Sequence, residues 1–215
     1  MKMRSEPRLK DLHPWLRNRV NELAVDHRTV NPDTSLCLIW GSRTVFEQQS
    51  AYKAGRSKIN GKTKFSLHNY YPTLAADLWV YTGADDDDPE IYENRPKRSE
   101  GLSLQLLQKG SLKRWYIPMG KLAVEVGLEA GALWRTFRDG PHVQVPKKQR
   151  IKLLQDALTA KGFEVGPSDG IIGSKTWGGI VLAQQQSGIL GSFKSRLMPV
   201  HPDLWQWLHE KEDVA

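Results

Sequence analysis

The sequence predicts an α+β fold, because short strand-like runs are interspersed with stretches of helical periodicity. Residues 35–40 and 74–81 are short and mostly apolar, as expected for buried strands. Residues 142–145 are expected to form a third, closing strand that ends at Pro146. Asp77 lies within the second run, so we expect its side chain to project from a strand.

Other stretches have features typical of helices. Residues 9–23 carry leucine and valine at roughly helical intervals, and residues 114–126 show a similar pattern. Residues 44–54 also have helical spacing and stop at Gly55, a residue type that favours the C-terminal end of a helix. We therefore expect helices to flank the strands.

The length of the chain suits one medium domain and one small one, at 215 residues and 39% hydrophobic content. The basic stretch 146–150 is interpreted as a linker, which divides the sequence into domains of residues 1–146 and 147–215. Within the second domain, residues 151–160 and 177–187 are expected to be helical.

Two segments outside these elements are less regular. Residues 83–101 are polar and include four consecutive aspartates at 85–88, so we interpret them as a long surface loop. Calcium loops alternate their acidic ligands and place a glycine midway, so the aspartate run is expected to be solvated. The tail from Gly191, with Trp205 and Trp207, is expected to fold back on one of the domains.

Charge and composition narrow the class of partner. The net charge of +7 favours an anionic partner such as nucleic acid, acidic lipid or an acidic wall polymer. The chain lacks the helix-turn-helix, zinc-finger and RNA-binding patterns, so a nucleic acid is not expected. No apolar stretch approaches the roughly 18 residues of a membrane helix, and the charged N-terminus does not resemble an export signal. A single cysteine, Cys37, excludes an internal disulfide.

Two histidines and one aspartate, His68, Asp77 and His142, are candidate ligands of a catalytic metal. A catalytic zinc takes three protein ligands and keeps a position open for water, whose pKa falls to about 7. Asp139 lies three residues before His142, where its carboxylate could act as general base and then general acid. The residues alone leave a plainer interpretation open, in which Asp139 only forms a turn and each histidine is an ordinary hydrogen-bonded side chain.

Three short motifs carry these residues, and a fourth lies between them: Ser66-Leu67-His68-Asn69, Ala75-Ala76-Asp77-Leu78, Trp134 to Phe137, and Asp139-x-x-His142. In this order they resemble the motifs of the M15 zinc peptidases, which include D-Ala-D-Ala carboxypeptidases and dipeptidases and phage L-alanyl-D-glutamate endolysins. The resemblance extends over residues 36–145. It implies a small antiparallel sheet flanked by helices, of the type shared with hedgehog proteins. It also implies one zinc ion on His68, Asp77 and His142, with Asp139 as the base.

Two segments near the first motif resemble the substrate side of the same family: Ser42-Arg43-Thr44 and Ala51 to Arg56. By this resemblance Arg43 lies near the scissile carbonyl or a substrate carboxylate, where a guanidinium stabilises negative charge. Arg56, Ser66 and Trp134 are further candidates for substrate binding, and Ser66 is also a candidate for orienting a ligand. Without the resemblance, a surface salt bridge is an equally good interpretation of Arg43.

The sequence departs from the family pattern between His68 and Asp77. The usual form has an aspartate seven residues after the histidine and a glycine three after it, whereas Asp77 follows His68 by nine residues. Tyr-Pro-Thr at 71–73 replaces the glycine. Because an expanded loop leaves the ligand usable, Asp77 stays in the predicted set. No Val-Thr segment follows Arg56, which leaves the substrate contacts open.

The C-terminal part carries a second set of motifs: Leu154-Gln155 with Leu158, Gly162, Asp169-Gly170-x-x-Gly173-x-x-Thr176, and Gln184. They resemble a three-helix peptidoglycan-binding domain of the kind appended to wall hydrolases. The Asp-Gly pair fits a tight turn that caps a helix. Ala183 departs from the pattern, because the family usually has an aromatic residue there.

The two resemblances together imply a monomeric phage endolysin with an N-terminal hydrolase and a C-terminal wall anchor. We expect zinc-dependent hydrolysis of a peptidoglycan stem-peptide bond, between L-Ala and D-Glu, and residence in the host cytoplasm until a separate pore releases the protein to the wall. One alternative is a D,D-carboxypeptidase that acts on D-Ala-D-Ala. An alternative of another class is a non-catalytic peptidoglycan-binding structural protein.

Overall fold

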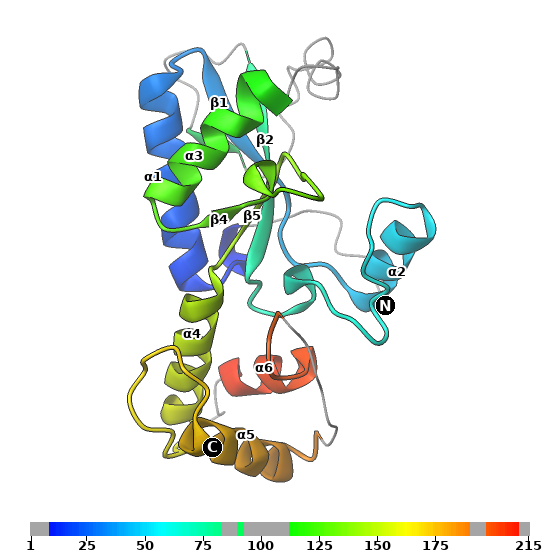
Figure 1. The fold of residues 1–215 in the computed structure, drawn as a ribbon, viewed down its shortest axis with the longest axis vertical. Coiled ribbons are helices and arrows are strands. Elements are labelled where there is room, and N and C mark those ends of the chain that lie inside the picture. The colour runs from blue at the N-terminus through cyan, green and yellow to red at the C-terminus, as the bar shows by residue number, and fades with distance from the viewer. Residues whose placement is uncertain (1–8, 83–89, 93–111, 190–196, 211–215) are drawn as a thin grey trace. The chain divides into compact units, whose positions relative to one another are not determined.

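The chain folds into two compact units in the computed structural model, which describes residues 9–82, 90–92, 112–189 and 197–210 (Figure 1). The first unit comprises Met1–Ser42 and Thr73–Val145, and the second comprises Arg43–Pro72 and Pro146–Ala215. Strands and helices are both present, which confirms the predicted α+β class. The division into a catalytic and a wall-binding domain at residue 146 stays a prediction.

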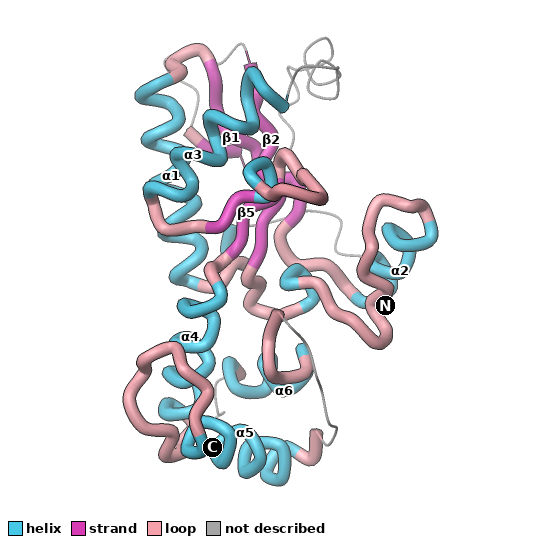
Figure 2. Tube along the Cα trace, viewed as in Figure 1, coloured by secondary structure: helices cyan, strands magenta, loops and turns pink. Residues whose placement is uncertain are grey.

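The first unit is built on a five-stranded sheet with the order β3-β1-β2-β5-β4. Figure 2 shows its strands in magenta. The strands are β1 (Thr34–Trp40), β2 (Ala75–Thr82), β3 (Ile91–Tyr92), β4 (Glu129–Ala130) and β5 (His142–Gln144). Four of them pair antiparallel, as predicted, whereas β3 pairs parallel with β1. The sheet aligns β2 with β5 and β5 with β4, and this alignment positions most of the candidate site.

Strand β3 is a correction to the prediction for residues 83–101, which were expected to form one loop. Ile91–Tyr92 pairs with Leu36 and Cys37 of β1. A two-residue strand within a polar segment is too short to show a recognisable strand pattern in the sequence. The aspartates at 85–88 lie outside the described residues, so their expected solvation stays a prediction.

Helices of the first unit cover the sheet with their apolar faces. Helix α1 (Pro14–Val30) packs against β1 and against α3 (Ile117–Glu125), which follows a π-helical turn at Leu112–Tyr116. Its fully buried side chains recur at helical spacing at Leu16, Val20 and Leu23.

Helix α1 begins later than the predicted 9–23, because Pro14 occupies the first turn and the His13 ring accepts a hydrogen bond from the Trp15 amide. Leu9–Asp11 forms a separate 3-10 turn. No helix among the described residues is long and apolar enough to cross a membrane.

The second unit contains α2 (Val45–Lys53), a 3-10 turn at Leu67–Asn69, α4 (Lys147–Ala160), α5 (Ser174–Ser187) and α6 (Pro202–His209). Helices α4, α5 and α6 contact one another pairwise, so the predicted C-terminal group of three helices is present. Residues 147–150 are the first turn of α4 and not part of a linker: Pro146 is the N-cap residue, and Arg150 and Ile151 are both buried.

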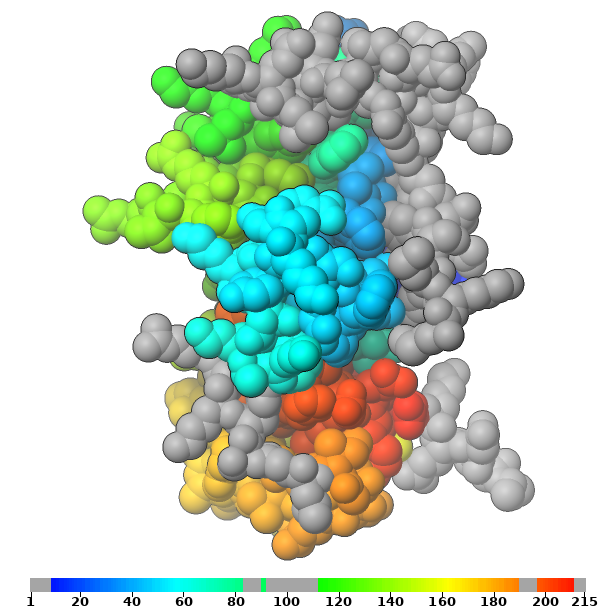
Figure 3. All heavy atoms as spheres, turned by 90° about the vertical axis from the view of Figure 1, so that its right-hand side faces the viewer, coloured from blue at the N-terminus to red at the C-terminus, as the bar shows by residue number. Residues whose placement is uncertain are grey.

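The C-terminal tail supplies α6, which packs on residues 43–72 of the same unit. Trp205 is fully buried, and its indole nitrogen donates to the carbonyl oxygen of Pro72 at 3.0 Å. The Tyr70 hydroxyl donates to the carbonyl oxygen of Val200, also at 3.0 Å. In Figure 3 the cyan to turquoise surface of this segment lies next to the red surface of the C-terminal helix. The tail therefore folds back as expected, and the segment that it contacts is residues 43–72.

Gln155 of α4 holds the predicted Asp-Gly turn together. Its amide donates to Asp169 and to Thr176, and its oxygen accepts from the amide of Gly170. Gly170 has φ +79°, and a Cβ there would lie 2.7 Å from the carbonyl oxygen of Lys148, so glycine is required twice over. The turn thus leads into α5 at Ser174.

Candidate metal centre

Asp77 and His142 face each other across two neighbouring strands. They are direct partners in the register of β2 and β5, which places their side chains on the same face of the sheet. The Nδ1 atom of His142 lies 3.0 Å from Oδ1 of Asp77. Both side chains are largely withdrawn from solvent, with 9% and 14% exposure for His142 and Asp77. Asp77 therefore projects from a strand toward a histidine, as predicted.

The other side of the His142 ring is also occupied. Its Nε2 atom lies 3.0 Å from Oε1 of Gln144, and the Gln144 amide nitrogen donates to the carboxylate of Glu129. The indole of Trp134 packs beside the imidazole with the ring centroids 5.2 Å apart. These contacts fix the plane of the ring from three directions.

The pKa of His142 is raised in this setting. Burial opposes the charged form, but the hydrogen bond and the charge of Asp77, the hydrogen bond to Gln144 and the charge of Asp139 together outweigh it. The site is therefore strongly attractive to positive charge at Nδ1, whether that charge is a proton or a cation.

His68 lies in the 3-10 turn at Leu67–Asn69, which Ser66 caps. The Ser66 hydroxyl accepts from the His68 amide, and the Asn69 side chain accepts from the Ser66 amide. The His68 carbonyl in turn accepts from the Arg43 amide at 2.7 Å. His68 is 2% exposed. The local role of Ser66 is thus to cap the turn that carries His68.

His68, Asp77 and His142 each offer one ligand atom, and these atoms all lie within 4.8 Å of one another. The three predicted ligands thus form a candidate metal site, and the longer spacing from His68 to Asp77 does not prevent it. Two neutral imidazoles and one carboxylate form the donor set of three-ligand catalytic zinc sites, so these residues fit the expected metal.

Asp139 is held by backbone contacts one turn before His142. Its amide donates to the Gly131 carbonyl at 3.1 Å, and its carbonyl accepts from the His142 amide at 3.3 Å. A Cβ on Gly131 would lie 2.5 Å from the carbonyl oxygen of Asp139, so only glycine allows this approach. The negative charge of the Asp139 carboxylate raises the pKa of His142. Burial raises the pKa of Tyr116, and the charge of Asp139 raises it further.

The Arg43 guanidinium is oriented by a buried glutamine. Its Nη1 donates to Oε1 of Gln48 at 3.1 Å, and the Gln48 amide donates to Ser57 and to the carbonyl of Ile59, each at 2.8 Å. Gln48 is fully buried in α2. Arg56, by contrast, is exposed on the loop that follows α2.

The structure reveals four residues around the candidate site that the sequence analysis missed: Gln48, Glu129, Gly131 and Gln144. Gln144 carried the clearest signal, because residues two apart on a strand share a face, and it follows the ligand His142 at that spacing. Glu129 becomes its partner only through strand pairing.

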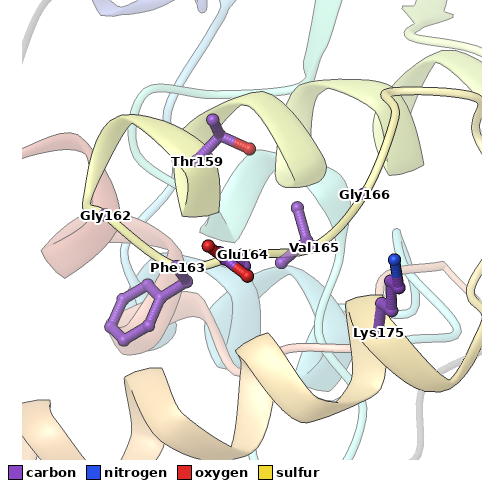
Figure 4. Close-up of a pocket in the computed structure, with 7 residues that line it drawn as sticks. All are labelled: Thr159, Gly162, Phe163, Glu164, Val165, Gly166 and Lys175. Atoms are coloured by element: carbon purple, nitrogen blue, oxygen red, sulfur yellow. The ribbon is translucent and has the colours of Figure 1, made fainter.

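A separate hollow of about 480 Å³ opens on the second unit (Figure 4). Its lining residues are Thr159, Gly162, Phe163, Glu164, Val165, Gly166 and Lys175. It combines one aromatic ring, one carboxylate and one ammonium group on the segments that end α4 and begin α5. Of the residues in the C-terminal motifs, Gly162 alone lines it.

Comparison with known proteins identifies a curated relative. The chain is 25% identical over 140 residues to the peptidoglycan L-alanyl-D-glutamate endopeptidase CwlK of Bacillus subtilis (strain 168), covering 63% of this chain and 74% of CwlK. The crystal structure of the Serratia marcescens L-Ala D-Glu endopeptidase ChiX matches with a TM-score of 0.41 and 22% identity, over 66% of this chain and 85% of that one. No family model matches the chain.

The similarity to CwlK confirms the predicted resemblance to M15-type peptidases. Together with the group formed by His68, Asp77 and His142, it also confirms the predicted class of enzyme, a metallopeptidase. The resemblance of residues 147–215 to a peptidoglycan-binding domain stays a prediction.

Proposed function

We propose that this chain is a zinc-dependent peptidoglycan peptidase that hydrolyses the amide bond between L-Ala and D-Glu in the stem peptide. The observation that carries the proposal is the group of His68, Asp77 and His142 in a chain similar to CwlK. The scissile bond is inferred from the activity named for CwlK. The residues of this chain provide the three candidate ligands and a nearby carboxylate.

In this proposal His68, Asp77 and His142 hold one zinc ion, which when bound polarises the scissile carbonyl and makes water more acidic. Asp139 accepts a proton from the attacking water and delivers it to the leaving amine, as the new C–O bond forms and the C–N bond breaks. The charge of Asp139 already acts on His142, which supports its place beside the reaction.

Arg43 stabilises the negative charge that develops on the substrate oxygen, or binds a substrate carboxylate. Its hydrogen bond to Gln48 supports this role, because a guanidinium held in one orientation loses less entropy on binding an oxyanion. Trp134 forms a wall of the site beside His142, and Ser66 contributes through the turn that it caps. Arg56 is exposed and provides an outer contact to the peptide.

We further propose that residues 147–215 anchor the enzyme to peptidoglycan, through the hollow lined by Phe163 and Lys175. Sugar rings pack on aromatic side chains, and an ammonium group suits the carboxylates of a wall polymer. Anchoring raises the local concentration of the hydrolase on an insoluble substrate, and the net charge of +7 suits an acidic wall. A monomeric phage lysin released from the host cytoplasm would use both activities.

The test of the hydrolytic proposal is mass spectrometry of purified peptidoglycan digested by the zinc-loaded protein, with a chelated control. New D-Glu amino termini that disappear with chelator are expected. Released D-Ala would instead assign a D,D-carboxypeptidase. Binding to the wall without new termini would assign a non-catalytic binding protein.

The test of the anchor is sedimentation of the protein with insoluble peptidoglycan. Replacing Phe163 by alanine is expected to leave more protein in the supernatant, while hydrolysis of a soluble muropeptide is unchanged. Ile171→Ala is the matched control, because Ile171 is 64% exposed and lies outside the hollow. Equal sedimentation of the Phe163 variant and the unsubstituted protein would remove the hollow from the proposal.

A further inference from the structure

One face of three neighbouring strands carries a continuous row of polar side chains. Asp77 of β2 pairs with His142 of β5, and Gln144 of β5 pairs with Glu129 of β4. His142 and Gln144 are two residues apart on the same strand and therefore point to the same face. Strand register alone thus places a carboxylate, an imidazole, an amide and a second carboxylate in sequence across the sheet.

The direction of the hydrogen bonds in this row is set by Glu129, because an ionised carboxylate only accepts hydrogen bonds. The Glu129 carboxylate accepts from the Gln144 amide nitrogen. With its NH₂ group turned to Glu129, Gln144 must turn its carbonyl oxygen to His142, and Oε1 indeed lies 3.0 Å from Nε2. A carbonyl oxygen only accepts, so Nε2 of His142 carries a hydrogen.

The hydrogen on Nε2 decides which nitrogen of His142 binds a metal. A neutral imidazole has one N–H and one lone pair, so the lone pair is on Nδ1, 3.0 Å from Oδ1 of Asp77. Two acceptor atoms at this separation repel each other unless positive charge is shared between them. That arrangement suits two ligands of one cation.

We propose that Gln144 and Glu129 are positioning residues that hold His142 in the tautomer that offers Nδ1 to the metal. This inference rests on the proposed function, in which His142 is a zinc ligand. Gln144 and His142 are both buried, so water does not readily replace the amide as the partner of Nε2. Outer partners of this kind change metal affinity by about 10- to 100-fold when they are removed.

The test uses zinc affinity and the nitrogen chemical shifts of His142, neither of which requires substrate. Gln144→Leu is expected to weaken zinc binding by about 10- to 100-fold in competition with a chelating dye. In the unsubstituted zinc protein, ¹⁵N spectra are expected to show the metal on Nδ1 and the hydrogen on Nε2. Gln185→Leu, on the exposed face of α5, is the matched control and is expected to bind zinc normally.

An exchanged pair separates positioning from mere packing. In the double variant Glu129→Gln and Gln144→Glu, the new carboxylate accepts from His142 Nε2 and from the new amide, so zinc affinity is expected to return to within a few-fold. Gln144→Glu alone places two carboxylates together and is expected to bind zinc poorly. Three results would each overturn the inference: a folded double variant that still binds zinc weakly, a Gln144→Leu variant with unchanged zinc affinity, or ¹⁵N spectra that place zinc on Nε2.

The outcomes separate this inference from the proposed function. Zinc binding that responds to Gln144 in a protein that cleaves no peptidoglycan would support the positioning role and refute the hydrolase. Hydrolysis with zinc binding that ignores Gln144 would refute the positioning role alone. An unsubstituted protein that binds no zinc would overturn both.

Discussion

Asp139 and His142 share a turn whose backbone is held against Gly131 by the hydrogen bond from the Asp139 amide to the Gly131 carbonyl. Their order along the chain, with the acidic residue first, leaves the His142 side chain on β5 and the Asp139 side chain in the loop before it. In the proposed mechanism, this arrangement separates the group that would hold the metal from the one that would transfer protons. The two roles can therefore be tested separately.

Replacing Asp139 by asparagine removes the proton acceptor and keeps the size of the side chain. We expect the hydrolysis rate to fall by about 10²- to 10⁴-fold, the usual contribution of a general base. Zinc content and the far-ultraviolet circular dichroism spectrum are expected to be unchanged, because Asp139 is held through its backbone. An unchanged rate would remove Asp139 from the mechanism.

Gly131→Ala tests the close approach that holds the turn. The added methyl group would lie 2.5 Å from the Asp139 carbonyl oxygen and 3.0 Å from the His142 Cβ, so the turn must shift. We expect a loss of about 1–3 kcal/mol in the free energy of unfolding, together with reduced hydrolysis. Gly178→Ala is the control, because a Cβ there meets nothing within 4 Å. Equal denaturation midpoints for the two variants would contradict the strain argument.

The candidate ligands are predictable from the sequence, and the residues that support them are not. His68, Asp77 and His142 stand in short motifs whose order is visible in one chain. Gln144 and Glu129 become partners only because β4 and β5 pair in one register, and register depends on the whole sheet. Gln48 and Gly131 were missed for a related reason, because each acts through contacts with residues distant in the sequence, Ile59 and Asp139 among them.

Helix α1 and strand β1 are joined by a buried histidine, His27, whose ring has one hydrogen-bond partner among the described residues. Nε2 of His27 lies 2.9 Å from the Thr34 hydroxyl, which itself donates to the Asn31 carbonyl. The hydroxyl therefore accepts from Nε2–H, and Nδ1 is a buried acceptor. Burial lowers the pKa of His27 to about 4, so the folded protein holds the ring neutral.

His27 is expected to make the stability of the fold depend on pH. Between pH 6.5 and about 4 the unfolded chain binds a proton at this ring and the folded chain does not, so stability falls as the pH falls. The full effect, below pH 4, is about 3 kcal/mol. His27→Gln keeps a donor to Thr34 without a titrating ring, and urea unfolding of this variant is expected to change less from pH 7 to pH 4.5. Parallel curves for both proteins would contradict the assignment.

Secondary structure type is predictable here from apolar spacing, whereas the ends of elements are set by local contacts. The capping box of Thr44 and Glu47 begins α2 close to where its periodicity begins. Helix α4 instead begins at Lys147, directly after Pro146 and in a basic stretch that resembles a linker, although Arg150 in that stretch is buried. A charged residue that packs inward cannot be distinguished from an exposed one by composition alone.

At the scale of the whole molecule, the segment with His68 and the C-terminal tail belong to one packing unit although they are far apart in the chain. Tyr70 and Trp205 are both fully buried, with their rings edge to face at 6.4 Å. The first of them directly follows the turn at Leu67–Asn69. The proposed wall anchor therefore also packs on the segment that carries His68, a proposed metal ligand.

Removing residues 147–215 is therefore expected to damage the proposed metal centre as well as the anchor. The truncated chain loses the hydrogen bonds of Tyr70 and Pro72 to α6 and its preceding segment, and exposes the Tyr70 ring. We expect weaker zinc binding and a lower melting temperature than in the full chain, measured by metal titration and thermal unfolding.

A milder change asks the same question within the full chain. Trp205→Ala empties a fully buried site and is expected to cost about 3–5 kcal/mol of stability, with zinc affinity reduced because His68 lies in the segment that Trp205 covers. Trp177→Ala is the control, since Trp177 is 51% exposed on α5 and its loss is expected to change neither quantity. If residues 1–146 alone bound zinc as tightly as the full chain, α6 would have no part in holding the turn that carries His68.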